Sequence, residues 1–199
     1  QIGDTFALAS RAKEQTRTEM LRAASRKVLA YLEAVTPAGH GVVVAGIGWT
    51  ALFGEAHERP EHYLEKADRD AREWRTAGVA HECLRLATQQ RQALGAGKHI
   101  QHIEYQALLR WEEVLGKVLK DEFTLTLDDE GRAVKVTHPV QKTKGSYRRG
   151  SMVDLDATFR LHGDKSQLGY NANIAVSVNF IREINAMPGA APDSTGVAN

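Results

Sequence analysis

Cysteine is almost absent from this chain, since Cys83 is the only one among 199 residues. An intrachain disulfide is therefore excluded, and the reducing cytoplasm is the expected compartment. Long apolar runs are missing too. The longest, residues 41–48, is far too short to span a bilayer. The first residues also lack the apolar core and small-residue cleavage site of a signal peptide. The sequence thus predicts a cytoplasmic protein that does not enter a membrane.

Neither sign of charge is in strong excess, because 26 Lys and Arg face 25 Asp and Glu and give a net charge of +1. Whole-chain electrostatics therefore predict no particular partner, and any nucleic-acid signal must come from local clustering. The chain also lacks a nucleophile elbow, a phosphate-binding loop and a dinucleotide fingerprint. Its 42% hydrophobic content is ordinary for a globular protein with a buried core.

Helical periodicity dominates the first part of the chain. Residues 4–35 carry apolar side chains at three- and four-residue spacing, which predicts one helix over that range. Three further apolar stripes predict helices at 63–74, 79–94 and 100–118. Residues 41–47 are compatible with a short buried strand, although their glycines weaken that interpretation.

The period changes from 3.6 to 2 near residue 121. Residues 123–136 alternate on either side of a turn that contains Gly131, which predicts a β-hairpin. Residues 168–178 and 180–187 predict two more strands. The expected fold class is α+β, with a mainly helical N-terminal two-thirds followed by antiparallel strands.

Four cations and no acid occupy residues 141–150, namely Lys142, Lys144, Arg148 and Arg149. A flexible cationic loop of this kind suits contacts with nucleic-acid phosphates, because each contact releases condensed counterions. The alternative is a solvated connection between two pairs of strands.

Two carboxylates, Asp154 and Asp156, fall on the same side of an extended chain. Paired carboxylates can hold Mg²⁺ for phosphoryl transfer. Asp-x-Asp is a common pattern, however, and a turn or capping role is the favoured interpretation. No histidine has a partner at zinc-site spacing, and Cys83 lies on an apolar stripe where it is expected to pack as a small hydrophobic residue.

Residues 150–177 resemble a stretch that is familiar from insertion-sequence transposases of the Asp-Asp-Glu kind. The family pattern is roughly Ser-x-x-Asp-Pro-Asp-Ala-Arg, a linker with Lys and Gly, and then Gly-Tyr-Asn/Lys-x-x-x-Ala-Val-Asp. The spacing fits without gaps, but Leu155 replaces the usual Pro and Ser177 replaces the usual Asp. Residues 180–195 are similar to the family's next strand, and residues 4–6 to a short motif that follows the first catalytic aspartate.

The resemblance implies a partial RNase H-like sheet, with the helices of residues 58–119 inserted between its first and second strands. Residues 1–120 would then form a helical region, and residues 121–199 an incomplete β-rich part of the transposase domain. The three catalytic carboxylates would lie before Gln1 and after Asn199. The resemblance therefore implies an internal fragment without catalytic residues, while Mg²⁺-dependent cutting and joining of DNA belongs to the intact parent.

DNA at transposon ends is the partner that this resemblance implies. Six cations would hold the DNA backbone without reading its bases: Lys142, Lys144, Arg148, Arg149, Arg160 and Lys165. Two alternatives stay open. One is a regulatory DNA-binding protein derived from a truncated transposase gene, and the other is a helical interaction module whose Trp111 stripe packs against a partner. A homo-oligomer is compatible with each, because an incomplete sheet leaves an unpaired edge.

Overall fold

The computed structural model describes residues 2–9, 14–37, 49–55, 57–94, 102–140, 148–162, 165–177, 180–188 and 190–191. The chain forms two compact units. The helical unit spans Arg17–Lys142, and the sheet unit combines Gln1–Thr16 with Thr143–Asn199. The helical unit is therefore inserted in the sequence between two parts of the sheet unit. Helices precede most of the strands and every strand pairing is antiparallel, which confirms the α+β class.

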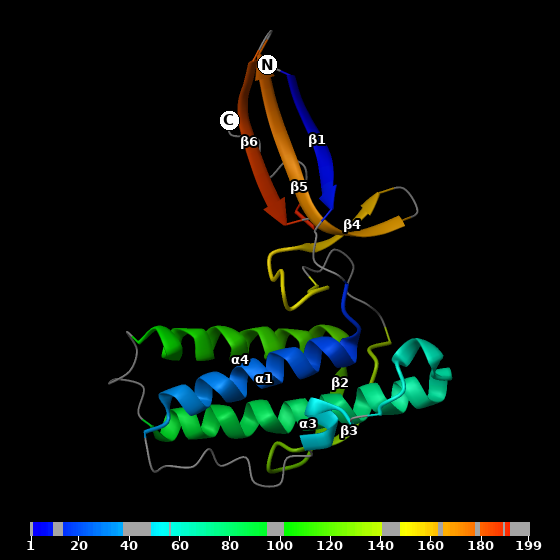
Figure 1. The fold of residues 1–199 in the computed structure, drawn as a ribbon, viewed down its shortest axis with the longest axis vertical. Coiled ribbons are helices and arrows are strands. Elements are labelled where there is room, and N and C mark those ends of the chain that lie inside the picture. The colour runs from blue at the N-terminus through cyan, green and yellow to red at the C-terminus, as the bar shows by residue number, and fades with distance from the viewer. Residues whose placement is uncertain are drawn as a thin grey trace. The chain divides into compact units, whose positions relative to one another are not determined.

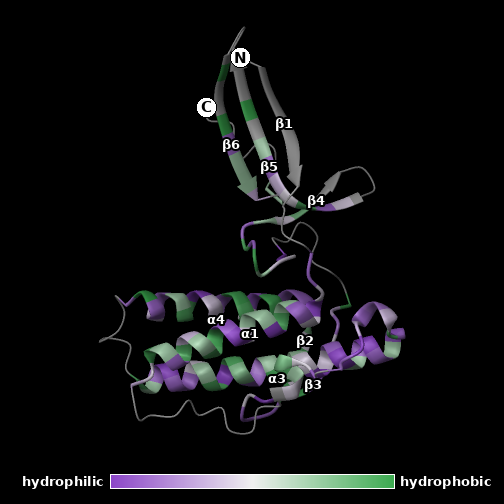
Figure 2. Cartoon of the chain, in the orientation of Figure 1, coloured by the Kyte–Doolittle hydropathy of each residue, from purple (hydrophilic) through white to green (hydrophobic). Residues whose placement is uncertain are grey.

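Three long helices build the helical unit: α1 (Arg17–Val35), α3 (Lys66–Ala93) and α4 (Ile103–Glu122). The short elements α2 (Trp49–Phe53) and η1 (Glu61–Tyr63) lie between α1 and α3 in the chain. Figure 1 shows the long helices side by side, and Figure 2 shows hydrophobic and hydrophilic residues alternating along them. Each helix buries one stripe against the others; α1 and α4 are amphipathic, whereas α3 is polar along most of its length.

Small residues on α3 let the larger side chains of the other two helices fill the core. The apolar part of the buried stripe of α3 consists of Ala77, Ala80, Cys83 and Ala87. The fully buried leucines of α1 and α4 include Leu21, Leu32, Leu108 and Leu115. Cys83 is completely buried, which confirms its prediction as a small packing residue. Truncating one such buried leucine to alanine would cost roughly 2–5 kcal/mol.

The predicted hairpin is confirmed as β2 (Thr124–Leu127) and β3 (Ala133–Thr137). Asp128 Oδ1 accepts hydrogen bonds from the backbone N–H groups of Glu130 and Arg132, and Gly131 takes a φ of +76°. Only glycine adopts such a φ without cost. The carbonyl oxygen of Gly131 lies 2.9 Å from His81 Nε2 on α3, which ties the turn to the helix.

The sheet unit is organised around one long strand, β5 (Lys165–Ser177). On one edge it pairs with β1 (Ile2–Ala9), and on the other with β4 (Thr158–His162) and β6 (Phe180–Pro188). The register fixes this order, because Gly169 pairs with both Ala9 and Thr158. The predicted strands at 168–178 and 180–187 are thus confirmed as β5 and β6. No strand among the described residues pairs with the outer edge of β1.

Two sequence predictions about helix boundaries were wrong. Residues 4–35 are not one helix, because residues 2–9 form β1 and the helix begins at Arg17. The partner of β1 is far away in the sequence, and tertiary pairing of this kind overrides local pattern. The stripes at 63–74 and 79–94 also do not form two helices, because α3 runs unbroken from Lys66 to Ala93.

Candidate functional site

The six predicted DNA-binding cations are placed unequally by the fold. Lys142 and Lys144 lie outside the described residues. The other four belong to the sheet unit, in or just before the strand pair β4–β5. We define the basic edge as these four residues: Arg148, Arg149, Arg160 and Lys165.

The backbone brings three members of the basic edge to one end of the sheet. Arg149 forms an isolated antiparallel bridge with Thr158, the first residue of β4. Arg160 pairs with Gln167 and Lys165 pairs with His162, so positions 160 and 165 are diagonal neighbours in the ladder. Diagonal positions in an antiparallel pair are roughly 7–8 Å apart. That spacing is close to the separation of successive phosphates along one nucleic-acid strand.

Arg149 has an unusual environment for a cation. The residue is half-buried, and its Nε is buried without a hydrogen-bond partner among the described residues. A buried donor left unpaired costs about 1–3 kcal/mol, so such donors are normally satisfied by an acceptor. Phosphate oxygens are strong acceptors for a guanidinium. Because Nε is buried in this structure, a phosphate oxygen could pair with it only if the Arg149 side chain moved.

The transposase-like motif of residues 150–177 is built mainly of structural contacts. Asp154 Oδ1 accepts hydrogen bonds from the backbone N–H of Ala157 at 3.2 Å and from the Tyr170 hydroxyl at 2.5 Å. These contacts fit the turn and capping role and leave that oxygen poorly placed to hold Mg²⁺. The hydrogen bond to Asp154, together with burial, raises the pKa of Tyr170 to about 12. The Ser-x-x-Asp half of the motif is thereby joined to its Gly-Tyr-Asn half.

Further hydrogen bonds hold the same loop to the segment that precedes α1. Gln15 donates its backbone N–H to the Gly150 carbonyl at 2.9 Å, and its side-chain Oε1 accepts from the Met152 N–H at 2.5 Å. Ser151 is fully buried, and its Oγ accepts from the backbone N–H of Val153. The loop that precedes β4, which includes the backbone at Arg149, is therefore fixed by several hydrogen bonds.

One cluster in the helical unit carries ligand types that suit a metal. Asp70, Glu73 and His138 each offer a ligand atom, and these atoms lie within 4.8 Å of one another. Glu73 Oε2 already accepts hydrogen bonds from His138 Nε2 at 2.8 Å and from Arg17 Nη1 at 3.0 Å. A cation at this point would have to displace the proton that His138 Nε2 donates to Glu73 and compete with the Arg17 guanidinium. These contacts favour a structural role, in which two donors satisfy a buried carboxylate.

Sequence reasoning did not identify this charge cluster, and no local signal could have revealed it. Arg17 also donates through Nε to Glu122 Oε2 at 2.8 Å, and its two carboxylate partners are 56 and 105 residues away in the sequence. Glu73 and Glu122 are both 3% exposed. Charged residues on amphipathic helices usually face solvent, whereas these three join α1, α3 and the end of α4.

None of the described helices combines the length and apolar character needed to cross a bilayer.

Comparison with known proteins adds no identification. The chain matches no protein-family model, no curated protein and no solved structure.

Proposed function

We propose that this chain is a DNA-contacting part of an insertion-sequence transposase of the Asp-Asp-Glu kind, and that it binds the DNA backbone without cutting it. No residue of the chain is assigned a catalytic role. The proposal starts from the resemblance of residues 150–177. The topology supports it, because β1 pairs directly with β5 although the whole helical unit lies between them in the sequence. The resemblance implies an insertion between the first and second strands of the sheet, and the helical unit stands in the sequence between β1 and the next strand of that sheet, β4.

The observation that carries the DNA-binding part of the proposal is the arrangement of the basic edge. Three of its four cations occupy backbone positions at one end of a hydrogen-bonded sheet. One of them, Arg149, has a buried donor with no partner among the described residues. A rigid strand pair positions cations better than a free loop, because less side-chain and backbone entropy is lost on binding.

Phosphate contacts of this kind have a characteristic salt dependence. Each phosphate neutralised by Lys or Arg contributes about −0.9 to the slope of log K against log salt for duplex DNA. Loss of four such contacts would therefore make the slope shallower by about 3.6. Because the contacts are with the backbone, affinity should vary little with base sequence.

The test is a titration of the purified chain with duplex DNA of mixed sequence over a range of salt concentrations. The test variant replaces the four cations of the basic edge, Arg148, Arg149, Arg160 and Lys165, by alanine. The control removes the same charge from exposed cations of the helical unit, Lys27, Lys66, Arg110 and Lys120. Circular dichroism of both variants checks that each remains folded.

We expect the native chain to bind DNA at low salt, with an affinity that falls steeply as salt rises. The test variant should lose most of the affinity and of the salt slope, whereas the control should keep most of both. Equal losses in the two variants would mean that DNA affinity depends on the net charge alone and not on where the cations lie. Absence of binding at low salt would refute the DNA-contacting function.

A further inference from the structure

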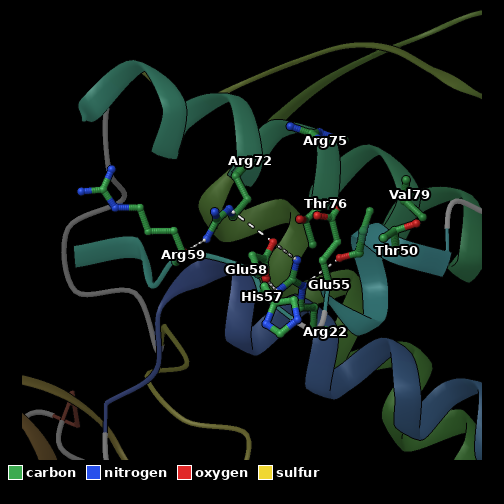
Figure 3. Close-up of a pocket in the computed structure, with 11 residues that line it drawn as sticks. Arg22, Thr50, Glu55, His57, Glu58, Arg59, Arg72, Arg75, Thr76 and Val79 are labelled. Carbon is green, nitrogen blue, oxygen red and sulfur yellow. Dashed lines mark hydrogen bonds and ion pairs between the residues drawn. The ribbon is translucent and has the colours of Figure 1, made fainter. Parts of the chain in front are cut away.

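A polar pocket of about 440 Å³ lies within the helical unit, between α1, α2, the segment that follows α2, and α3. Four arginines and two glutamates line it, together with His57. With His57 neutral, the lining has an excess of two positive charges. The arginines are Arg22, Arg59, Arg72 and Arg75 (Figure 3). A site of this composition is suited to an anion and not to an apolar ligand.

Glu58 fixes two of these arginines at the inner side of the pocket. Arg22 donates two hydrogen bonds to the Glu58 carboxylate, at 2.5 and 2.8 Å, and a third to the Ala51 carbonyl at 2.8 Å. Arg72 Nε lies 3.4 Å from Glu58 Oε1, and its Nη1 donates to the Arg59 carbonyl at 2.7 Å. Figure 3 shows these side chains converging on Glu58. The inner guanidinium groups are therefore held in place before any ligand arrives.

The electrostatics of Glu58 are those of a carboxylate in a strongly positive surrounding. The hydrogen bonds from Arg22 lower the pKa of Glu58, and the charges of Arg22, Arg72 and Arg75 lower it further. One carboxylate thus compensates only part of the positive charge around it. The remaining lining carboxylate, Glu55, is exposed and forms no ion pair within the described part of the chain.

The two outer arginines differ from the inner pair. Arg59 and Arg75 are both exposed, and among the described residues neither guanidinium forms a salt bridge. Gly54, just after α2, has a φ of +80°, and a Cβ there would lie 3.1 Å from Glu58 Oε2 and 3.2 Å from Arg22 Nη1. Glycine at this turn therefore lets the backbone pass close to the inner ion pair. The inner wall of the pocket is thus fixed by ion pairs, and Arg59 and Arg75 line its outer part. Figure 3 shows the Arg59 side chain extending away from Glu58, so it would have to turn inward to meet a ligand in the pocket.

We propose that this pocket binds a phosphate group, with Arg59 and Arg75 as its direct ligands and Arg72 contributing charge from the inner wall. Guanidinium forks match the paired oxygens of a phosphate and bind it through charge-assisted hydrogen bonds. The volume lies in the range of small-molecule sites and leaves room beyond the phosphate itself. The phosphate can belong to a small ligand or to a nucleic-acid backbone. Because all of the pocket residues belong to the helical unit, the proposal does not depend on the basic edge.

The test measures binding of inorganic phosphate, adenosine monophosphate and duplex DNA by isothermal titration at constant ionic strength. The loss variant is Arg59→Ala/Arg75→Ala, which leaves the inner ion pairs intact. The matched control is Lys27→Ala/Lys66→Ala, which removes two exposed cations of the same unit from outside the pocket. The gain variant is Glu55→Gln, which removes a negative charge from the lining.

We expect the loss variant to bind phosphate at least about tenfold more weakly, the control to bind like the native chain, and the gain variant to bind several-fold more tightly. A gain cannot result from misfolding. If the loss variant binds adenosine monophosphate more weakly but keeps its DNA affinity, the phosphate group belongs to a small ligand. If the loss variant binds DNA more weakly and adenosine monophosphate does not bind the native chain, the phosphate group belongs to the nucleic-acid backbone.

The proposal is overturned if none of the three probes binds, or if the loss variant and the control lose affinity equally. These results are separable from a failure of the proposed DNA-contacting function. The variant of Arg148, Arg149, Arg160 and Lys165 changes the sheet unit alone, whereas the variant of Arg59 and Arg75 changes the pocket alone.

Discussion

Replacing Arg17 by methionine would remove a guanidinium that lies between two buried carboxylates. The side chain of Arg17 is 27% exposed, whereas those of Glu73 and Glu122 are each 4% exposed. Methionine keeps much of the apolar stem, so the loss of packing is small. The main effect is that Glu73 loses one of its two donors and Glu122 loses its bond to Arg17 Nε.

The expected loss of stability follows from what happens when a buried ion pair loses only one of its two partners. Removing one partner of a buried pair typically costs 3–5 kcal/mol, because the other charge stays buried without compensation. Since a domain has a net stability of only about 5–15 kcal/mol, Arg17→Met should destabilise the helical unit severely. Changing Glu73 and Glu122 to glutamine in the same chain should recover most of the loss, because neutral amides need no counter-charge.

Tryptophan fluorescence during urea unfolding is a suitable assay, because all three tryptophans belong to the helical unit. The control is Arg26→Ala on the same helix. Arg26 is exposed, and its Nε donates only to a backbone carbonyl of α1, so we expect a change within about 0.5 kcal/mol. The reasoning is refuted if Arg17→Met costs less than about 1 kcal/mol, or if the triple variant is less stable than the single one.

Three further predictions concern single groups. Burial raises the pKa of Cys83 to about 12, so the thiol should resist a disulfide reagent in the native chain and react when urea unfolds the helical unit; rapid labelling without denaturant would contradict this. The pKa of Tyr170 is raised from 10.0 to about 12 in the folded state. The stability from its hydrogen bond should therefore be complete below pH 10.0 and be lost as pH rises toward about 12. Ultraviolet titration should show one late tyrosine that titrates earlier in Asp154→Asn. A methyl group on Gly150 would lie 2.7 Å from two apolar side chains, so Gly150→Ala should lower the stability of the sheet unit by about 1–3 kcal/mol, measured by thermal unfolding followed by circular dichroism.

Local pattern was sufficient where an element is specified by its own residues. The hairpin followed from the alternation on either side of Gly131, and the buried state of Cys83 followed from its place on an apolar stripe. Strand β1 could not be recognised in this way, because its hydrogen bonds come from residues 169–176. The phosphate pocket was missed for a similar reason. Arg22 and Arg72 look like ordinary helical surface charges until the fold places Glu58 between them.

The transposase-like motif shows why resemblance and chemistry must be tested separately. Asp154 and Tyr170 match the family pattern, yet their side chains bond to each other and hold a loop to the middle of β5. A motif with such contacts specifies how the sheet is built. A sheet built in this way does not by itself specify which ligand binds. The resemblance therefore predicts the surroundings of β5 better than it predicts a ligand. The proposed link to DNA rests on the cations next to that framework, Arg149 above all, and their substitution is the experiment that decides between ancestry and function.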